Sequence, residues 1–150
     1  MPKANKKHLK FDTSSLQDAP RTNQFAEPQG GYLDRYPEFS FKHYAHAHKD
    51  YSCHCITIID DFYEFFERLK AISALKWKDI KFSGQFHFHP IEWSQTAEPS
   101  GFKDLPPVLE GYPACQFKVF KECRVIGFFN ARNIFEIVWI DRYHKVYPSK

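Results

Sequence analysis

The sequence predicts a single α+β domain in which helices pack on an antiparallel β-sheet. Three observations predict this class. Aromatic residues make up 18% of the chain, with Phe 16 and Tyr 8 against Met 1, and aromatic side chains favour strands. One apolar stripe of helical period lies near the middle of the chain, and three strand-like runs fill the last third. Because 150 residues fit one domain, we expect that domain to span residues 39–150.

Residues 1–38 differ in composition from the rest of the chain. Four lysines stand in the first ten positions, and Ser, Gln, Pro and a Gly30-Gly31 pair come after them without sustained periodicity. This pattern predicts a flexible basic N-terminal arm. The arm could contact nucleic acid or serve only as a solubilising tail.

The chain shows no signal for export or membrane insertion. No apolar stretch follows the basic start, as a signal peptide would require. No run approaches the roughly 18 apolar residues of a membrane span. We therefore expect a cytoplasmic protein with no membrane partner and with its four cysteines reduced.

The elements of the first half are a hairpin and a helix. Residues 39–44 alternate as a strand does, and residues 51–58 could be the hairpin partner. Asp60 or Asp61 could cap the helix that comes next, with Glu64 completing a capping box. The helix has one stripe of large apolar side chains, which we expect to be buried: Phe62, Phe65, Phe66, Leu69, Ile72 and Leu75.

Shorter elements come after the helix, and the sheet completes the chain. Residues 77–80 predict a short second helical turn. Residues 85–89 alternate as a strand, which Pro90 either ends or confines to the edge of a sheet. Residues 94–113 predict a long surface loop, because they are rich in proline and glycine. Three strands complete the sequence, with a turn at 130–133; the last is almost continuously apolar, as a strand covered on both faces should be. Their expected ranges are 116–120, 124–129 and 134–140.

Positive charge is concentrated near the C-terminus. The formal net charge of the chain is +3, but from Lys118 onward seven basic residues stand against three acidic ones, an excess of four. Such a distribution favours an anionic partner such as nucleic acid.

The same C-terminal region resembles the signature of the RelE/ParE toxin superfamily. The resemblance lies in Cys123-Arg-Val-Ile-Gly-Phe-Phe, a strand that begins with an Arg-Val pair, and in the apolar strand Ile-Phe-Glu-Ile-Val-Trp-Ile, which closes with Asp-Arg-Tyr-His144-Lys-Val-Tyr147. It covers roughly residues 60–82 and 114–148. It implies a RelE-like fold with an N-terminal extension. The implied activity is that of an mRNA interferase, an endoribonuclease that cuts mRNA on the ribosome, with a cognate antitoxin protein as its partner.

In the nuclease branch of that family the ribose 2′-hydroxyl attacks the adjacent phosphorus, and no metal or other cofactor is required. The resemblance implies that Arg124 is the phosphate clamp, since a guanidinium donates two parallel hydrogen bonds to phosphate oxygens. It implies acid, base or stacking roles for His144 and Tyr147, and an added positive charge at Lys118. Further RNA contacts are expected from basic and histidine side chains at Lys145, Arg142, Arg132, His89 and His87.

Simpler readings stand beside these roles. Arg124 could be a strand residue paired with Glu122 or Glu136, Lys118 a solvated strand residue, and Tyr147 an anchor for the chain end. His144 could be an ordinary surface histidine.

Other readings concern the whole protein and its histidines and cysteines. The whole protein could be a non-catalytic interaction protein of phage or mobile-element origin with the same fold. His87 and His89 could bind a metal together with side chains of the predicted hairpin: His46, His48, Cys53 or Cys55. The two cysteines could equally be small buried apolar residues.

Overall fold

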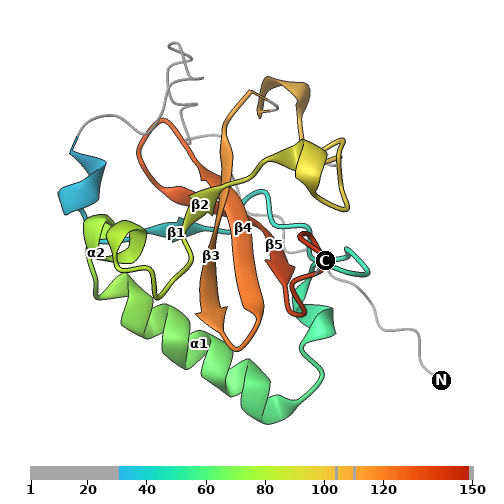
Figure 1. Ribbon diagram of the computed structural model, residues 1–150, viewed down its shortest axis with the longest axis horizontal. Helices are drawn as coiled ribbons and strands as arrows, with labels where there is room; N and C mark the ends of the chain where they lie inside the picture. Colours follow the sequence, from blue (N-terminus) through green and yellow to red (C-terminus); the bar gives the residue numbers. More distant parts are fainter. Residues whose placement is uncertain (1–30, 104, 110, 149–150) are drawn as a thin grey trace, which may run out of the picture.

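The computed structural model describes residues 31–103, 105–109 and 111–148. These residues form an α+β domain around a five-stranded mixed sheet with strand order β1-β5-β4-β3-β2 (Figure 1). The expected α+β class is therefore confirmed. The sheet is not wholly antiparallel, because β1 pairs with β5 in parallel. The strands are β1 (Phe39–Ser40), β2 (His89–Pro90), β3 (Ala114–Phe120), β4 (Cys123–Phe129) and β5 (Phe135–Asp141).

The three long strands at the C-terminus match the sequence prediction. β3, β4 and β5 form an antiparallel meander, and every residue of β4 and β5 is buried. The near-continuous apolar runs of β4 and β5 arise because other segments cover both faces of the sheet. The turn between them is held by Asn130, whose side-chain oxygen accepts the backbone N–H groups of Arg132 and Ile134.

The predicted hairpin of residues 39–44 and 51–58 is wrong. Only Phe39–Ser40 is a strand, and it pairs with β5 instead of with its neighbour in sequence. Residues 51–58 contain a short 3-10 helix, Cys53–Cys55. The segment packs on the sheet through single contacts, with Ala45 N–H donating to Val138 O and Ile140 N–H to Tyr51 O, both at 3.0 Å. Apolar alternation could not tell this docking from strand pairing.

Helix α1 (Ile59–Ser73) lies where the apolar stripe predicted a helix, and α2 (Trp77–Phe82) includes the short helical turn predicted at 77–80. Phe65, Leu69 and Ile72 are buried against the sheet, but Phe62 and Phe66 are 40% and 51% exposed. The apolar stripe is wider than the contact with the sheet, so part of it faces outward. The predicted capping box is absent from α1, since Ile58 occupies the N-cap without a side-chain bond and Asp61 forms ion pairs instead.

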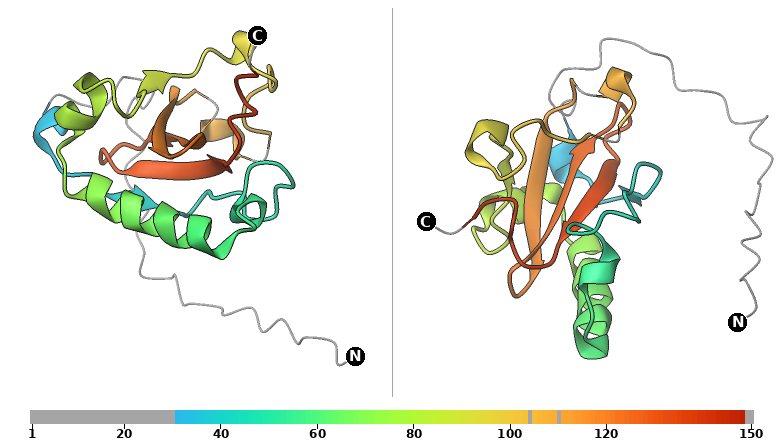
Figure 2. Two further views of the ribbon diagram at one scale, coloured as in Figure 1. Left: turned by 60° about the horizontal axis from the view of Figure 1, so that its bottom comes forward. Right: turned by 90° about the vertical axis from the view of Figure 1, so that its right-hand side faces the viewer.

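The sheet separates two hydrophobic cores, and Figure 2 shows the helices on one side and loops on the other. We call these sides the helix face and the loop face. The helix-face core contains Phe65, Trp77 and Ile137 among others. The loop-face core is formed by residues from the middle strands and from the segments that cross them: Tyr51, Leu105, Ile126, Phe128, Val138, Trp139 and Val146.

A β-bulge at Gly127 decides which residues of β5 belong to each face. The register shifts between Ile126, which pairs with Trp139, and Gly127, which pairs with Ile137. Val138 is the extra residue, and it joins Trp139 in the loop-face core. A Cβ on Gly127 would lie 1.8 Å from the carbonyl oxygen of Glu136. Only glycine fits at this position, and the bulge brings two consecutive large residues to one face.

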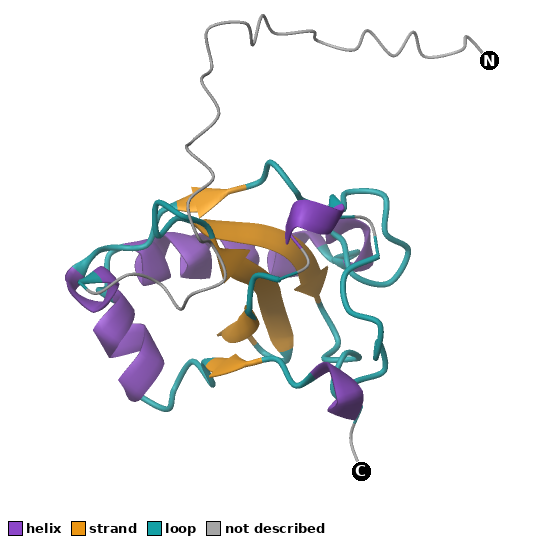
Figure 3. Ribbon diagram, turned by 90° about the horizontal axis from the view of Figure 1, so that it is seen from above, coloured by secondary structure: helices purple, strands orange, loops and turns teal. Residues whose placement is uncertain are grey.

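The remaining segments deviate from the predictions in smaller ways. The strand expected at 85–89 is only His89–Pro90, because His87 has a φ of 46°. The expected loop of 94–113 has two short 3-10 helices at Trp93–Gln95 and Pro107–Leu109, and most of it lies over the loop face (Figure 3). Within the described residues, no helix has the length and apolar character needed to cross a membrane.

Part of the predicted N-terminal arm belongs to the folded domain. Residues 1–30 lie outside the described residues, but 31–38 pack against the sheet and helices. Tyr32 is buried, Trp77 N–H donates to Arg35 O, and Phe135 N–H donates to Glu38 O. The domain therefore begins before residue 39.

Candidate active site on the loop face

Arg124 lies at the start of β4, at the end of the sheet where the C-terminal tail leaves β5. Its cross-strand neighbours are Lys118 on β3 and Asp141 on β5. Directly paired residues of antiparallel strands project to the same face. Arg124 shares its face with Ile126, two positions along β4, which is in the loop-face core. The three side chains therefore start from one row on the loop face.

The Arg124 guanidinium is buried and forms no ion pair with a described residue, although Asp141 is its cross-strand neighbour. The residue is 8% exposed, and its Nε and Nη1 atoms have no hydrogen-bond partner among the described residues. Burial lowers the pKa of Arg124, and the nearby charge of Asp141 only partly opposes this. A buried cation without a hydrogen-bonded anion is costly to the fold. The arrangement is suited to an anion that brings its own oxygen atoms.

Asp141 holds the tail against this end of the sheet. It is fully buried, and its two carboxylate oxygens accept the backbone N–H groups of Lys145 and Val146, each at 2.9 Å. Burial raises the pKa of Asp141, while these two hydrogen bonds act in the opposite direction. The tight turn it closes includes His144 with a φ of 57°. Asp141 thus determines where the His144 backbone lies.

His144 lies within electrostatic range of Arg124. Burial lowers the pKa of His144, and the positive charge of Arg124 lowers it further, against the smaller opposing effect of Asp141. The imidazole is half-buried, so one side stays open to solvent. With a pKa below 6.5 it is neutral near pH 7 and able to accept a proton.

A second imidazole lies beside the tail. His89 Nδ1 is 2.7 Å from Pro90 O, and its Nε2 is 2.7 Å from the side-chain nitrogen of Gln116. Since a carbonyl only accepts, Nδ1 carries the proton and Nε2 accepts from the Gln116 amide. Gln116 is 1% exposed, and its Oε1 has no hydrogen-bond partner in the described part of the chain. A buried unpaired acceptor therefore accompanies the buried unpaired cation.

Tyr147 joins the tail to the covering loop. Its hydroxyl oxygen accepts the backbone N–H of Glu92 at 2.8 Å. Its ring centroid is 5.4 Å from that of His89 and 6.4 Å from that of His144. Tyr147 therefore lies between the two imidazoles, with its hydroxyl oxygen already accepting one bond. This contact gives it an anchoring role besides any contact with substrate.

The other expected site residues are spread over the molecule. Lys145 is exposed beside the tail turn, 3.8 Å from an oxygen of Asp50. His87 is exposed, outside β2. Arg132 is exposed in the turn at the opposite end of β4 from Arg124. Arg142 is buried and bonded to Asp61 of α1. The structure thus brings together Arg124, His144, Tyr147 and His89, and leaves Arg132 and Arg142 apart. Lys118 is paired with Arg124 through the backbone, but it also lines a separate cavity beside α1.

Two residues of this cluster were not expected from the sequence. Asp141 reads as the polar end of an apolar strand, and Gln116 as an ordinary strand residue. Only the pairing of Gln116 with His89 and the return of the tail to Asp141 reveal their positions. His89 does lie on an edge strand, which is one of the two positions that Pro90 predicted for this segment.

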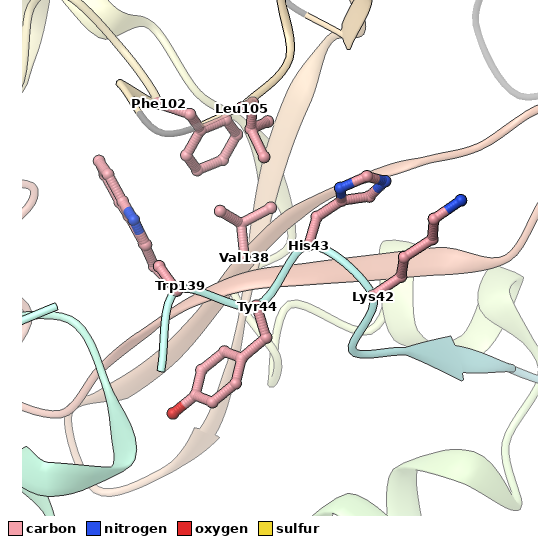
Figure 4. Close-up of a pocket in the computed structure, with 8 residues that line it drawn as sticks. Lys42, His43, Tyr44, Phe102, Leu105, Val138 and Trp139 are labelled. Carbon is pink, nitrogen blue, oxygen red and sulfur yellow. The ribbon is translucent and has the colours of Figure 1, made fainter. Parts of the chain in front are cut away.

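A cavity of about 200 Å³ opens on the same face, further along β5 (Figure 4). Its lining residues come from the segment after β1, from the covering loop and from β5: Lys42, His43, Tyr44, Ala45, Phe102, Leu105, Val138 and Trp139. Figure 4 shows the Tyr44 ring pointing away from the cavity, and its hydroxyl accepts the Cys53 N–H at 2.7 Å. Burial lowers the pKa of His43.

The described residues contain no group of three or more His, Cys, Asp or Glu side chains placed to hold a metal ion. The four cysteines are reduced thiols: Cys53 and Cys55 are half-buried, and Cys115 and Cys123 are buried. The cysteines suggested as metal ligands therefore have no cluster to complete within the described ranges.

Comparison with known proteins adds no relatives to this picture. No protein-family model matches the chain, and no curated protein and no solved structure matches it.

Proposed function

We propose that this protein is a metal-independent endoribonuclease of RelE-like architecture that cuts mRNA on the ribosome and is neutralised by a cognate antitoxin. The observation that carries the proposal is Arg124, a buried guanidinium with two unpaired donor atoms, paired across the sheet with Asp141, whose carboxylate holds the turn that carries the half-buried His144. A phosphodiester supplies the missing negative charge and the acceptor oxygens. The ribosome and the antitoxin come from the family resemblance.

In the proposed reaction the 2′-oxygen of the ribose forms a bond to phosphorus while the bond from phosphorus to the 5′-oxygen breaks. His144 takes the proton of the 2′-hydroxyl, since its lowered pKa leaves the imidazole neutral near pH 7. Arg124 stabilises the charge that gathers on the phosphate oxygens. The departing 5′-oxygen takes a proton from water. The products are a 2′,3′-cyclic phosphate and a 5′-hydroxyl end.

Lys118 and Tyr147 support this reaction in different ways. Lys118 is the cross-strand neighbour of Arg124, and we propose that it adds positive charge for the RNA backbone. Tyr147 anchors the turn that carries His144, through its bond to Glu92 N–H. Asp141 positions the same turn from the sheet side.

Cleavage of mRNA on translating ribosomes tests the proposal. Wild-type protein is compared with Arg124→Met, His144→Gln and the control Arg68→Met, which removes an exposed arginine of α1 that pairs with Glu64. We expect cutting to fall by about 100-fold or more in the first two variants and to persist in the control. A 2′-deoxy substitution at the scissile nucleotide should abolish cutting by the wild type. Equal cutting by all variants would remove the assigned site.

A second candidate is a non-catalytic interaction protein, and one observation favours it. The outer side of α1 exposes four large apolar side chains in a row, more than a monomer surface usually gathers at one place: Ile59, Phe62, Tyr63 and Phe66. Expression in bacteria separates the two functions. Growth arrest that disappears in Arg124→Met indicates the nuclease, and growth without arrest indicates the binding protein.

A further inference from the structure

We infer that the cavity on the loop face is a binding site for a nucleobase, and that it recognises a nucleotide next to the cut phosphate. This inference rests on the proposed function for its link to RNA. The cavity itself is argued from its walls, its mouth and its position on the sheet.

The walls of the cavity are aromatic and held in place before any ligand arrives. The Trp139 indole and the Phe102 ring meet edge to face with centroids 4.9 Å apart. On another side of Trp139, Tyr51 packs at 4.7 Å with an interplanar angle of 31°, and the Tyr51 hydroxyl donates to Glu98 at 3.1 Å. Rigid aromatic walls favour a flat aromatic ligand, since stacking requires little reordering of the protein.

The mouth of the cavity is polar and basic. Figure 4 shows His43 and Lys42 on the side opposite Trp139. The described part of the chain provides no hydrogen-bond partner for the His43 ring or for the Lys42 ammonium group. These nitrogens can meet the carbonyl and ring-nitrogen atoms at the edge of a base, which a purely apolar ligand would leave unpaired. A volume of about 200 Å³ is enough to hold a single ring system.

The position of the cavity connects it to the phosphate site. Val138 and Trp139 precede Asp141 on β5 by three and two residues, which corresponds to about 7–10 Å along a strand. Both sites open on the loop face, and the bulge at Gly127 is what turns Val138 and Trp139 to that face together. A strand of RNA gripped at Arg124 could therefore insert a neighbouring base between Trp139 and His43.

Nucleosides without phosphate test the cavity independently of the phosphate site. Adenosine, guanosine, cytidine and uridine are titrated into the full chain, and the indole resonances of Trp139, which lines the cavity, are followed by NMR. We expect at least one nucleoside to shift them. His43→Ala should weaken its binding about tenfold, the size of one stacking contact. His46→Ala is the matched control, because His46 is an exposed histidine three residues away that does not line the cavity.

Two further variants keep the test decisive. Phe102→Ala removes the other wall and should also weaken binding, with the melting temperature showing that the domain stays folded. Arg124→Met should leave nucleoside binding unchanged. Absence of nucleoside binding, or equal binding by His43→Ala and His46→Ala, would overturn the inference even if RNA cutting depends on Arg124. Nucleoside binding without any RNA cutting would uphold the cavity and overturn the nuclease.

Discussion

Two arginines near one end of the sheet are buried to the same degree, but only one of them forms an ion pair. Arg142, on the helix face, is 7% exposed, and its Nη2 donates to Asp61 on α1 at 2.7 Å. Its guanidinium also packs on the rings of Phe120 and Tyr143, with its central carbon 5.0 Å and 4.7 Å from their centroids. Arg124, on the loop face, is 8% exposed and forms no ion pair with any described residue. One guanidinium is ion-paired within the fold, and the other forms no ion pair with any described residue.

The packing around two buried tryptophans, one in each core, also differs between the two faces. Trp77 on the helix face is surrounded by the rings of Phe39, Phe117, Phe129 and Phe135, with centroids between 4.9 and 6.2 Å. Trp139 on the loop face has rings on some sides and a cavity on another. Dense packing and paired charges serve stability. Buried donors without a partner among the described residues occur on both faces, at Trp77 Nε1 and Arg142 Nε as well as at Arg124 Nε and Nη1. The two faces therefore differ in two respects: Arg142 is ion-paired and Arg124 is not, and a cavity lies beside Trp139.

The largest expected effect tests the feature on which both faces depend. Gly127→Ala places a Cβ against the Glu136 carbonyl, so the bulge must open and residues of β5 must leave one face or the other. We expect a loss of about 3 kcal/mol or more in the free energy of unfolding, measured by urea denaturation. Gly84→Ala is the control, since it has a φ of +66° but no atom within 4 Å. Equal losses in the two variants would contradict the role of the bulge.

The second prediction compares the two arginines directly. Arg124→Met removes an unpaired buried cation, so we expect the variant to be between equally stable and about 2 kcal/mol more stable than wild type. Arg142→Met deprives Asp61 of a partner and frees α1 from the end of β5, so we expect a clear loss of stability. Thermal and urea unfolding of both variants measure the difference. Destabilisation of the same size in both would mean that Arg124 has a structural role.

The smallest effect concerns the pKa of His144. Its pKa is lowered first by burial and then by the charge of Arg124. In Arg124→Met we therefore expect the pKa to rise, while burial still keeps it below the ordinary value of 6.5. NMR titration of the imidazole measures the shift. In wild type the neutral base persists to lower pH, so cutting should decline only on the acid side of 6.5.

The titration also tests whether the charge of Arg124 reaches His144. His43 serves as an internal control, because burial lowers its pKa and Arg124 is not among the causes. We expect the His43 titration to be unchanged in Arg124→Met. An unchanged His144 titration would show that the two proposed site residues do not share one electrostatic environment.

Most of the fold could be predicted where a local pattern and the final packing agree. The three C-terminal strands and both helices follow from runs whose period matches their secondary structure. The site could be predicted in part, since Arg124, His144 and His89 come together as residues of one cluster. The structural role of Arg142 could not be predicted. Alternation along β5 and the tail places Arg142 on the helix face, and its ion-pair partner there, Asp61, is distant in the sequence. The hairpin prediction for the segment that contains β1 was wrong for the same reason, because the partner of β1 is the distant strand β5.

The sequence by itself determined the elements of this protein: an aromatic-rich sheet, an amphipathic helix and a basic tail. These are consequences of spacing along the chain, and spacing decides which residues of one element share a face. The tertiary structure alone decided which charges are compensated. The bulge at Gly127, the return of the tail to Asp141 and the ion pair of Asp61 with Arg142 each join segments distant in sequence. Burial and ion pairing depend on such contacts. Only the folded structure could therefore show that Arg124 is buried without an ion pair among the described residues.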